Sequence, residues 1–132
     1  SIEQLIITNG ANKAPRVTPL DVEDNIMSEH YFTAADGADG TLSKSGQPYC
    51  YPKELGLVMF CVLILRNGQK VSGESIAFSE ETVNLEAGRK AARADALRKV
   101  WPMMTYALKE RLFYGQYKSQ QPQIQEVVGV AA

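Results

Sequence analysis

The clearest pattern of hydrophobic and polar positions along the chain is a pair of short apolar runs joined by a turn. Val58–Leu65 is rich in strand formers, and Val71–Phe78 follows it across Arg66-Asn67-Gly68-Gln69. Asn-Gly between two such runs supplies the positive φ values of a type I′ turn. The pattern therefore predicts an antiparallel β-hairpin. Because its first strand has few polar positions, we expect both faces of that strand to be covered.

A helical pattern precedes this hairpin. Thr18-Pro19 offers an N-cap followed by proline at the first helical position, and acidic residues fill the first turns. The spacing predicts a helix from Pro19 to about Phe32. Its buried stripe is expected to consist of Leu20, Val22, Ile26, Met27 and either His30 or Tyr31.

A second helical pattern follows the hairpin. Ser79 can cap it, Glu80 and Glu81 suit its first turn, and strong helix formers continue to Val100. Pro102 removes a backbone donor and disfavours helical geometry at Trp101, so we expect a break or kink there and a restart from Pro102 to about Tyr114. Two helices in a hairpin and one bent helix both fit.

The remaining segments have little apolar periodicity. Residues 34–52 are expected to form a long surface loop, in which Asp36-Gly-Ala-Asp39-Gly is a plain turn because it lacks the acidic spacing of a calcium loop. Residues 1–17 are predicted to be an N-terminal arm and residues 116–132 a C-terminal tail. The expected architecture is a single α+β domain over residues 18–115.

Composition supports one ordinary domain and excludes several classes of protein. The 132 residues are 45% hydrophobic and 22% charged, which is near the globular average. A net charge of −1 argues against binding to a DNA or RNA polymer or to a membrane surface, since such proteins carry a basic surplus. The longest apolar run, Leu57–Leu65, is much shorter than a membrane span. We expect residence in the cytoplasm.

The side chains that most often carry chemistry form no recognisable catalytic motif. His30 is the single histidine, and Cys50 and Cys61 have no CxxC spacing. We interpret both cysteines as free thiols, although the sequence leaves a disulfide between them open. We therefore expect no enzyme activity, no metal and no cofactor. A nucleotide-cleaving enzyme that recruits the glutamates at 74, 80, 81 and 86 is the alternative.

Three basic residues of the last helical segment share one side of it. Arg89, Lys90 and Arg93 lie three or four residues apart, and a phosphate group would relieve their mutual repulsion. The alternative is a solvated face, in which Glu86 pairs with Lys90 and Asp95 pairs with Lys99. Gly88 and the nearby alanines make another side thin enough for close packing or for the seam of a homo-oligomer.

Four motifs in order resemble the small phage proteins grouped under phages N4 and Sf6. They are Ser28–Asp36, Phe60–Gly68, Val71–Ser75 and Gly88–Ala96 continued through Trp101-Pro102, and together they span roughly Thr18 to Leu112. In this family the loop after the first motif is usually shorter, so Thr41–Pro52 looks like an insertion. The resemblance implies a phage protein.

The arrangement of strands followed by C-terminal helices is also similar in outline to the Thoeris anti-defence sponges. That similarity implies a homo-oligomer in the host cytoplasm that sequesters a cyclic ADP-ribose isomer or a cyclic oligonucleotide without cleaving it. The ligand-binding residues would then be Arg89, Lys90 and Arg93 for phosphate, Phe78 or Tyr31 for stacking on a base, and Ser75 and Asn84 for polar contacts. The alternative is a phage accessory protein that inhibits a host protein through the 34–52 loop and the tail.

Overall fold

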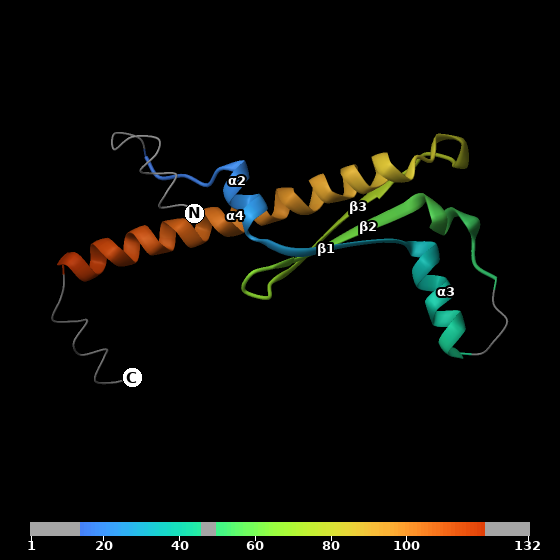
Figure 1. Ribbon diagram of the computed structural model, residues 1–132, viewed down its shortest axis with the longest axis horizontal. Coiled ribbons are helices and arrows are strands. Elements are labelled where there is room, and N and C mark those ends of the chain that lie inside the picture. Colours follow the sequence, from blue (N-terminus) through green and yellow to red (C-terminus); the bar gives the residue numbers. More distant parts are fainter. Residues whose placement is uncertain (1–13, 46–49, 121–132) are drawn as a thin grey trace.

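The computed structural model describes residues 14–45 and 50–120, and within them a three-stranded antiparallel sheet packs against one long helix (Figure 1). The strands are β1 (Ile26–Thr33), β2 (Val58–Leu65) and β3 (Lys70–Ile76), in the order β1-β2-β3. The helix α4 (Leu85–Gln120) lies on β3 and β2. The predicted α+β class, with a short N-terminal helix, an antiparallel sheet and a long C-terminal helix, is confirmed. Most of the expected arm and tail lies outside the described residues.

The first helix is much shorter than predicted. Helix α2 (Pro19–Asp24) begins where expected, because the Asp21 N–H donates to the Thr18 hydroxyl at 3.2 Å and the Thr18 N–H donates to the Asp21 carboxylate at 2.9 Å. It ends at Asp24, with Asn25 as its C-cap, and the predicted continuation to Phe32 is wrong, since Ile26–Thr33 forms β1.

Strand β1 explains why the helical stripe was misread. Of the side chains assigned to that stripe, Val22 is buried, whereas Leu20 and Met27 are exposed. After a register shift between Ile26 and Ser28, the side chains of β1 alternate between two faces, and pairing with β2 decides the conformation. Short apolar runs are compatible with both the helical period and the strand period. Pairing with β2, and not periodicity, therefore determines that these residues form a strand.

The predicted surface loop at 34–52 is also wrong over most of its length, because α3 (Ala34–Ser45) occupies it. The helix begins with a second capping box: the Asp36 N–H donates to the Thr33 hydroxyl at 3.1 Å, and the Thr33 N–H donates to the Asp36 carboxylate at 2.8 Å. Asp36 therefore caps a helix and is not part of a plain turn. A 3-10 turn, η1 (Lys53–Leu57), then leads into β2.

The hairpin of β2 and β3 is confirmed, but its turn is not the predicted type I′, because Gly68 has a positive φ and Asn67 does not. Its strands pair from Val58 with Ile76 to Ile64 with Lys70, and Gly68 in the turn has φ 88°. That positive angle is why glycine follows Asn67. The pairing register also fixes which side chains share each face of the sheet.

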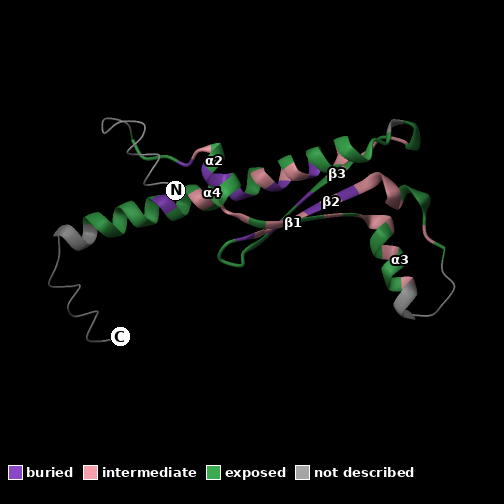
Figure 2. Ribbon diagram, in the orientation of Figure 1, coloured by how far each residue is buried: buried purple, intermediate pink, exposed green. Residues whose placement is uncertain are grey.

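One face of the sheet carries the core. Alternate residues of β2 point toward α4 and are buried, with Cys61 and Leu63 fully enclosed together with Ala92, Ala96 and Val100 of the helix (Figure 2). Gly73 lies directly beneath the helix: a Cβ there would stand 2.3 Å from the Ala92 carbonyl oxygen and 2.3 Å from the Ala96 nitrogen. The stripe of small residues is thus used by helix-to-sheet packing within one chain.

The opposite face is only partly covered, and we call it the open face. Its centre is apolar, because every side chain that β2 presents there is hydrophobic and half-exposed. Phe32 on β1 contacts Phe60, with ring centroids 5.7 Å apart. By register the open face comprises Ser28, His30 and Phe32, then Val58, Phe60, Val62 and Ile64, then Lys70, Ser72, Glu74 and Ile76.

The outer edge of β3 is capped by side chains of α4. The Glu74 N–H donates to the Asp95 carboxylate at 3.0 Å, and the Lys99 ammonium donates to the Ser72 carbonyl at 2.5 Å. The bond from the Glu74 backbone, followed by one from Arg98, holds the pKa of Asp95 below its usual value. These contacts occupy backbone N–H and carbonyl groups that could otherwise pair with another strand.

Helix α4 continues through Pro102 to Gln120 as one element, past the expected start of the tail at Gln116 (Figure 1). Of the two arrangements expected after Trp101, the helical hairpin is therefore excluded. Val100 and Leu108 are buried on either side of the proline, and their packing offsets the hydrogen bond that Pro102 cannot donate.

Both cysteines are free thiols, with Cys61 buried and Cys50 exposed, so the disulfide left open by the sequence is not formed. Over the described part of the chain, none of the helices is long and apolar enough to cross a membrane.

Candidate ligand-binding site at the start of the long helix

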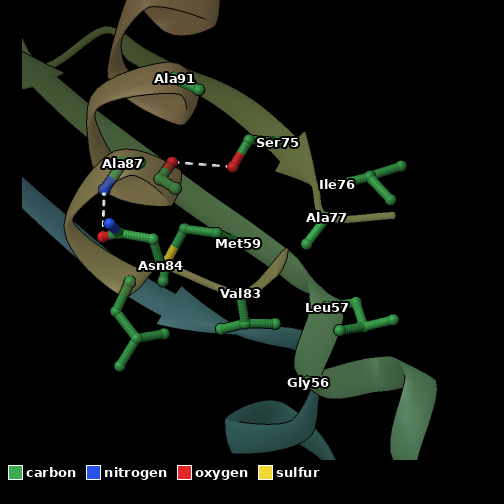
Figure 3. Close-up of a pocket in the computed structure, with 12 residues that line it drawn as sticks. Gly56, Leu57, Met59, Ser75, Ile76, Ala77, Val83, Asn84, Ala87 and Ala91 are labelled. Carbon is green, nitrogen blue, oxygen red and sulfur yellow. Dashed lines mark hydrogen bonds between the residues drawn. The ribbon is translucent and has the colours of Figure 1, made fainter. Parts of the chain in front are cut away.

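A pocket of about 210 Å³ lies where α4 begins, between the end of β3 and η1 (Figure 3). Its walls are mostly apolar, and the larger apolar side chains that line it are Leu57, Met59, Ile76, Val83 and Leu85. On the helix side the pocket is lined by the small residues Ala87, Gly88 and Ala91, which leave room for a ligand. Ser75 and Asn84 are the polar side chains on its walls, so the structure brings these two predicted contact residues together.

Asn84 sets the start of α4. The Ala87 N–H donates to the Asn84 side-chain oxygen at 3.1 Å, and the Gly88 N–H donates to the Asn84 carbonyl at 2.8 Å. This is the geometry of an N-cap, a position for which asparagine is well suited. The expected cap, Ser79, instead precedes a separate 3-10 turn, η2 (Glu80–Thr82). Because the amide oxygen makes the cap, the amide nitrogen is the group that Asn84 can offer to a ligand.

Ser75 reaches the same pocket from β3. Its hydroxyl donates to the Gly88 carbonyl at 2.7 Å, which leaves the oxygen as an acceptor for a ligand (Figure 3). A Cβ at Gly88 would lie 3.7 Å from both Met59 and the Ser75 hydroxyl, an ordinary contact distance. The pocket thus offers one donor and one acceptor within an apolar wall.

Phe78 lies outside this pocket but beside it. It is 95% exposed and lines an adjoining shallow pocket with Lys53, Leu57, Glu80 and Glu81. Leu57 belongs to both pockets, so the two are neighbours. Lys53 and Glu80 form an exposed ion pair at 3.9 Å. An aromatic ring and both signs of charge therefore lie beside the pocket.

The three basic residues proposed to bind phosphate are not equivalent. Lys90 pairs with Glu86 at 3.9 Å, as the solvated-face alternative expected, and Arg89 is exposed. Asp95 pairs with Arg98 at 3.0 Å and not with Lys99. The structure does not gather these cations around one point.

Arg93 joins three elements in an ion-pair cluster. Its guanidinium donates two bonds to Glu23 of α2, at 2.6 and 2.9 Å, and one to Glu29 of β1 at 2.9 Å. The bond from Arg93 lowers the pKa of Glu23, and the same carboxylate raises the pKa of Arg93. Arg93 therefore lies on the side of α4 that faces β1 and α2, away from the pocket residues.

Tyr31 belongs to this cluster and not to the pocket. Its hydroxyl donates to Glu29 at 3.1 Å, and burial, with Cys61 and Glu29 adding to it, raises the pKa of Tyr31 to about 12. A ring held in this way on the covered face of the sheet has a packing role in the chain.

Replacing Arg93 by alanine is expected to lower the free energy of unfolding by about 1.5–3 kcal/mol, because it removes three charge-assisted bonds and leaves two carboxylates facing each other. Urea unfolding measures the change. Arg98→Ala is the control, since Arg98 makes an exposed pair within one helix and its loss is expected to cost below about 0.5 kcal/mol. Equal effects of the two substitutions would contradict a structural role for Arg93.

The described part of the chain holds no group of three or more His, Cys, Asp or Glu side chains arranged to bind a metal ion.

One known protein family matches most of the chain. A family model described as "Phage protein (N4 Gp49/phage Sf6 gene 66) family" matches residues 17–112, well over half of the sequence. The chain belongs to this phage protein family. No curated protein and no solved structure matches the chain. The matched range includes the sheet, α2, α3 and α4 through Leu112, so the family pattern includes both the pocket and the ion-pair cluster.

Sequence patterns gave no sign of the apolar wall of the pocket. Leu57, Met59 and Val83 belong to three different elements or connections, and only the folded chain brings them together. A cap at Asn84 was detectable in principle, because asparagine followed by Leu-Glu-Ala-Gly begins a helix as well as Ser79 does.

Proposed function

We propose that this phage protein sequesters a nucleotide-derived signal, such as a cyclic ADP-ribose isomer or a cyclic oligonucleotide, without cleaving it. The observation that carries the proposal is the pocket at the start of α4, which sets Ser75 and Asn84 beside an apolar wall. A nucleobase is a flat apolar ring with a polar edge, and such a ring matches this combination. Asn84 would donate to that edge, and Ser75 would accept from it.

The size of the pocket determines which part of the ligand it would hold. Pockets for whole drug-sized ligands usually measure about 300–1,000 Å³, whereas this one is about 210 Å³. The base would therefore enter, and the ribose and phosphates would lie at the mouth. There Phe78 offers a ring, Lys53 offers a cation for phosphate, and the carboxylates of Glu80 and Glu81 can accept from ribose hydroxyls.

Thermal unfolding of the purified chain against cyclic ADP-ribose isomers, cyclic dinucleotides and cyclic trinucleotides tests the proposal. A ligand at 100 times its Kd adds about 2.7 kcal/mol to the free energy of unfolding, which shifts Tm clearly. Asn84→Asp keeps the N-cap acceptor but removes the amide donor, so it is expected to abolish the shift while changing stability by only a few tenths of a kcal/mol.

Asn67→Asp is the matched control. Asn67 lies in the hairpin turn and uses its side-chain oxygen to accept from the Gln69 N–H at 2.9 Å, so the same change adds one charge away from the pocket. This variant is expected to keep the ligand shift in full. No shift with any compound, or an equal loss in both variants, would contradict the proposal.

Inhibition of a host protein is the second candidate function, and the middle of α4 favours it. Met103 and Tyr106 are 40% and 68% exposed and lie three residues apart on one side of the helix, and exposed apolar side chains placed in this way suit a protein partner. This alternative predicts binding that Asn84→Asp leaves unchanged and Tyr106→Ala weakens.

A further inference from the structure

We propose that a second copy of this chain docks on the open face, so that two sheets pack face to face about a two-fold axis. This inference goes beyond the proposed function and needs no nucleotide. It rests on the apolar centre of the open face, on the blocked edge of β3 and on the distribution of charge along that strand.

The apolar centre shows that the open face is built to be covered. In an antiparallel sheet with one face in water, the exposed positions of a strand are normally polar. On β2 every position of the open face is hydrophobic: Val58, Phe60, Val62 and Ile64. Phe32 and Ile76, on the neighbouring strands, extend this surface and are 40% and 70% exposed. The sequence alone predicts that both faces of β2 are covered, and α4 covers only one.

The edge of β3 is a less suitable surface for association. Asp95 and Lys99 already bond to the Glu74 N–H and the Ser72 carbonyl on that edge. A partner strand would have to displace both side chains. The face of the sheet needs no such rearrangement.

The charges on the open face favour a copy of the same chain as the occupant. Lys70 and Glu74 lie two residues to either side of Ser72, and register places all three on the open face beside Ile64, Val62 and Phe60. We place the two-fold axis between the two sheets, perpendicular to the strands and directly over Ser72 and Val62. This axis lays β3 of one copy over β3 of the other, running in the opposite direction. Lys70 of each copy then faces Glu74 of the other, and Ile64 faces Phe60.

The dimensions of the open face predict a reversible dimer. Eight residues of β2 extend about 26 Å, and three strands with their side chains span about 15 Å, giving a flat footprint of roughly 400 Å². Stable interfaces bury about 800 Å² on each partner, so this one falls in the weaker class, and sheets packed in this way stand about 10 Å apart. We therefore expect weak, reversible association.

Sedimentation equilibrium of the full chain, from about 1 μM to about 100 μM, tests the inference. The expected result is a mass that rises with concentration from one chain toward two. Val62→Lys puts a charge at the centre of the face and is expected to hold the protein at the mass of one chain throughout. Tyr106→Lys is the control, because Tyr106 lies on α4 and is 68% exposed, and it is expected to dimerise like the unaltered protein.

Charge exchange provides a second readout that does not depend on tolerance of a lysine at position 62. Lys70→Glu or Glu74→Lys alone is expected to raise the dimer Kd about tenfold, and the double exchange is expected to restore it to within about threefold. A single-chain mass at every concentration would overturn the inference. So would a dimer that Val62→Lys leaves intact, or single exchanges that the double exchange does not rescue.

Discussion

Gly73→Ala is expected to lower the free energy of unfolding by about 3 kcal/mol or more, one of the largest effects of any single methyl group in this chain. The added carbon would lie 2.3 Å from the Ala92 carbonyl oxygen and 2.3 Å from the Ala96 nitrogen. Both atoms belong to the backbone of α4, so no side-chain rotation relieves the clash, and the helix must move away from β3. Urea unfolding followed by circular dichroism measures the change.

Gly37→Ala is the control for that experiment. Gly37 lies inside α3, and a Cβ there would meet nothing within 4 Å. Alanine in a helix is expected to stabilise the chain by about 0.5–1 kcal/mol relative to glycine. If Gly73→Ala proves as harmless as Gly37→Ala, α4 does not pack on β3 as described.

Leu63→Ala is expected to cost about 2–5 kcal/mol, because Leu63 is fully enclosed between the sheet and α4 and its truncation leaves a cavity. The control is its neighbour on the other face: Val62→Ala is expected to cost below about 1.5 kcal/mol when measured at concentrations too low for association. Chemical unfolding of both variants gives the comparison. A larger loss at Val62 than at Leu63 would invert the assignment of the two faces.

The predictions from sequence were most accurate where neighbouring residues alone determine the local structure. Asn67-Gly68 between two apolar runs defined the hairpin, since the positive φ of Gly68 is a local requirement. Thr18-Pro19 likewise fixed the start of α2. The capping box of Thr33 and Asp36 was equally local, but the glycines and small residues of α3 concealed the helix that follows it.

The other errors came from contacts that no local pattern contains. Residues 26–32 became a strand because β2 pairs with them, and α4 passed through Pro102 because Val100 and Leu108 are buried on either side of it. Arg93 appeared available for phosphate until the fold brought Glu23 and Glu29 to it from distant parts of the chain. Ser75 and Asn84, in contrast, were expected to contact a ligand and do share one pocket.

Methyl NMR of the methionines, during a titration with that panel of cyclic nucleotides, tests whether the pocket at the start of α4 binds a nucleotide-derived signal and leaves it whole. Met59 lines the pocket, whereas Met27 lies on β1 and Met103 lies on the middle of α4. One compound is expected to move the Met59 methyl signal, to leave those of Met27 and Met103 in place, and to be recovered intact. A Met59 signal that no compound moves, or recovery of a cleaved compound, would contradict the proposed function.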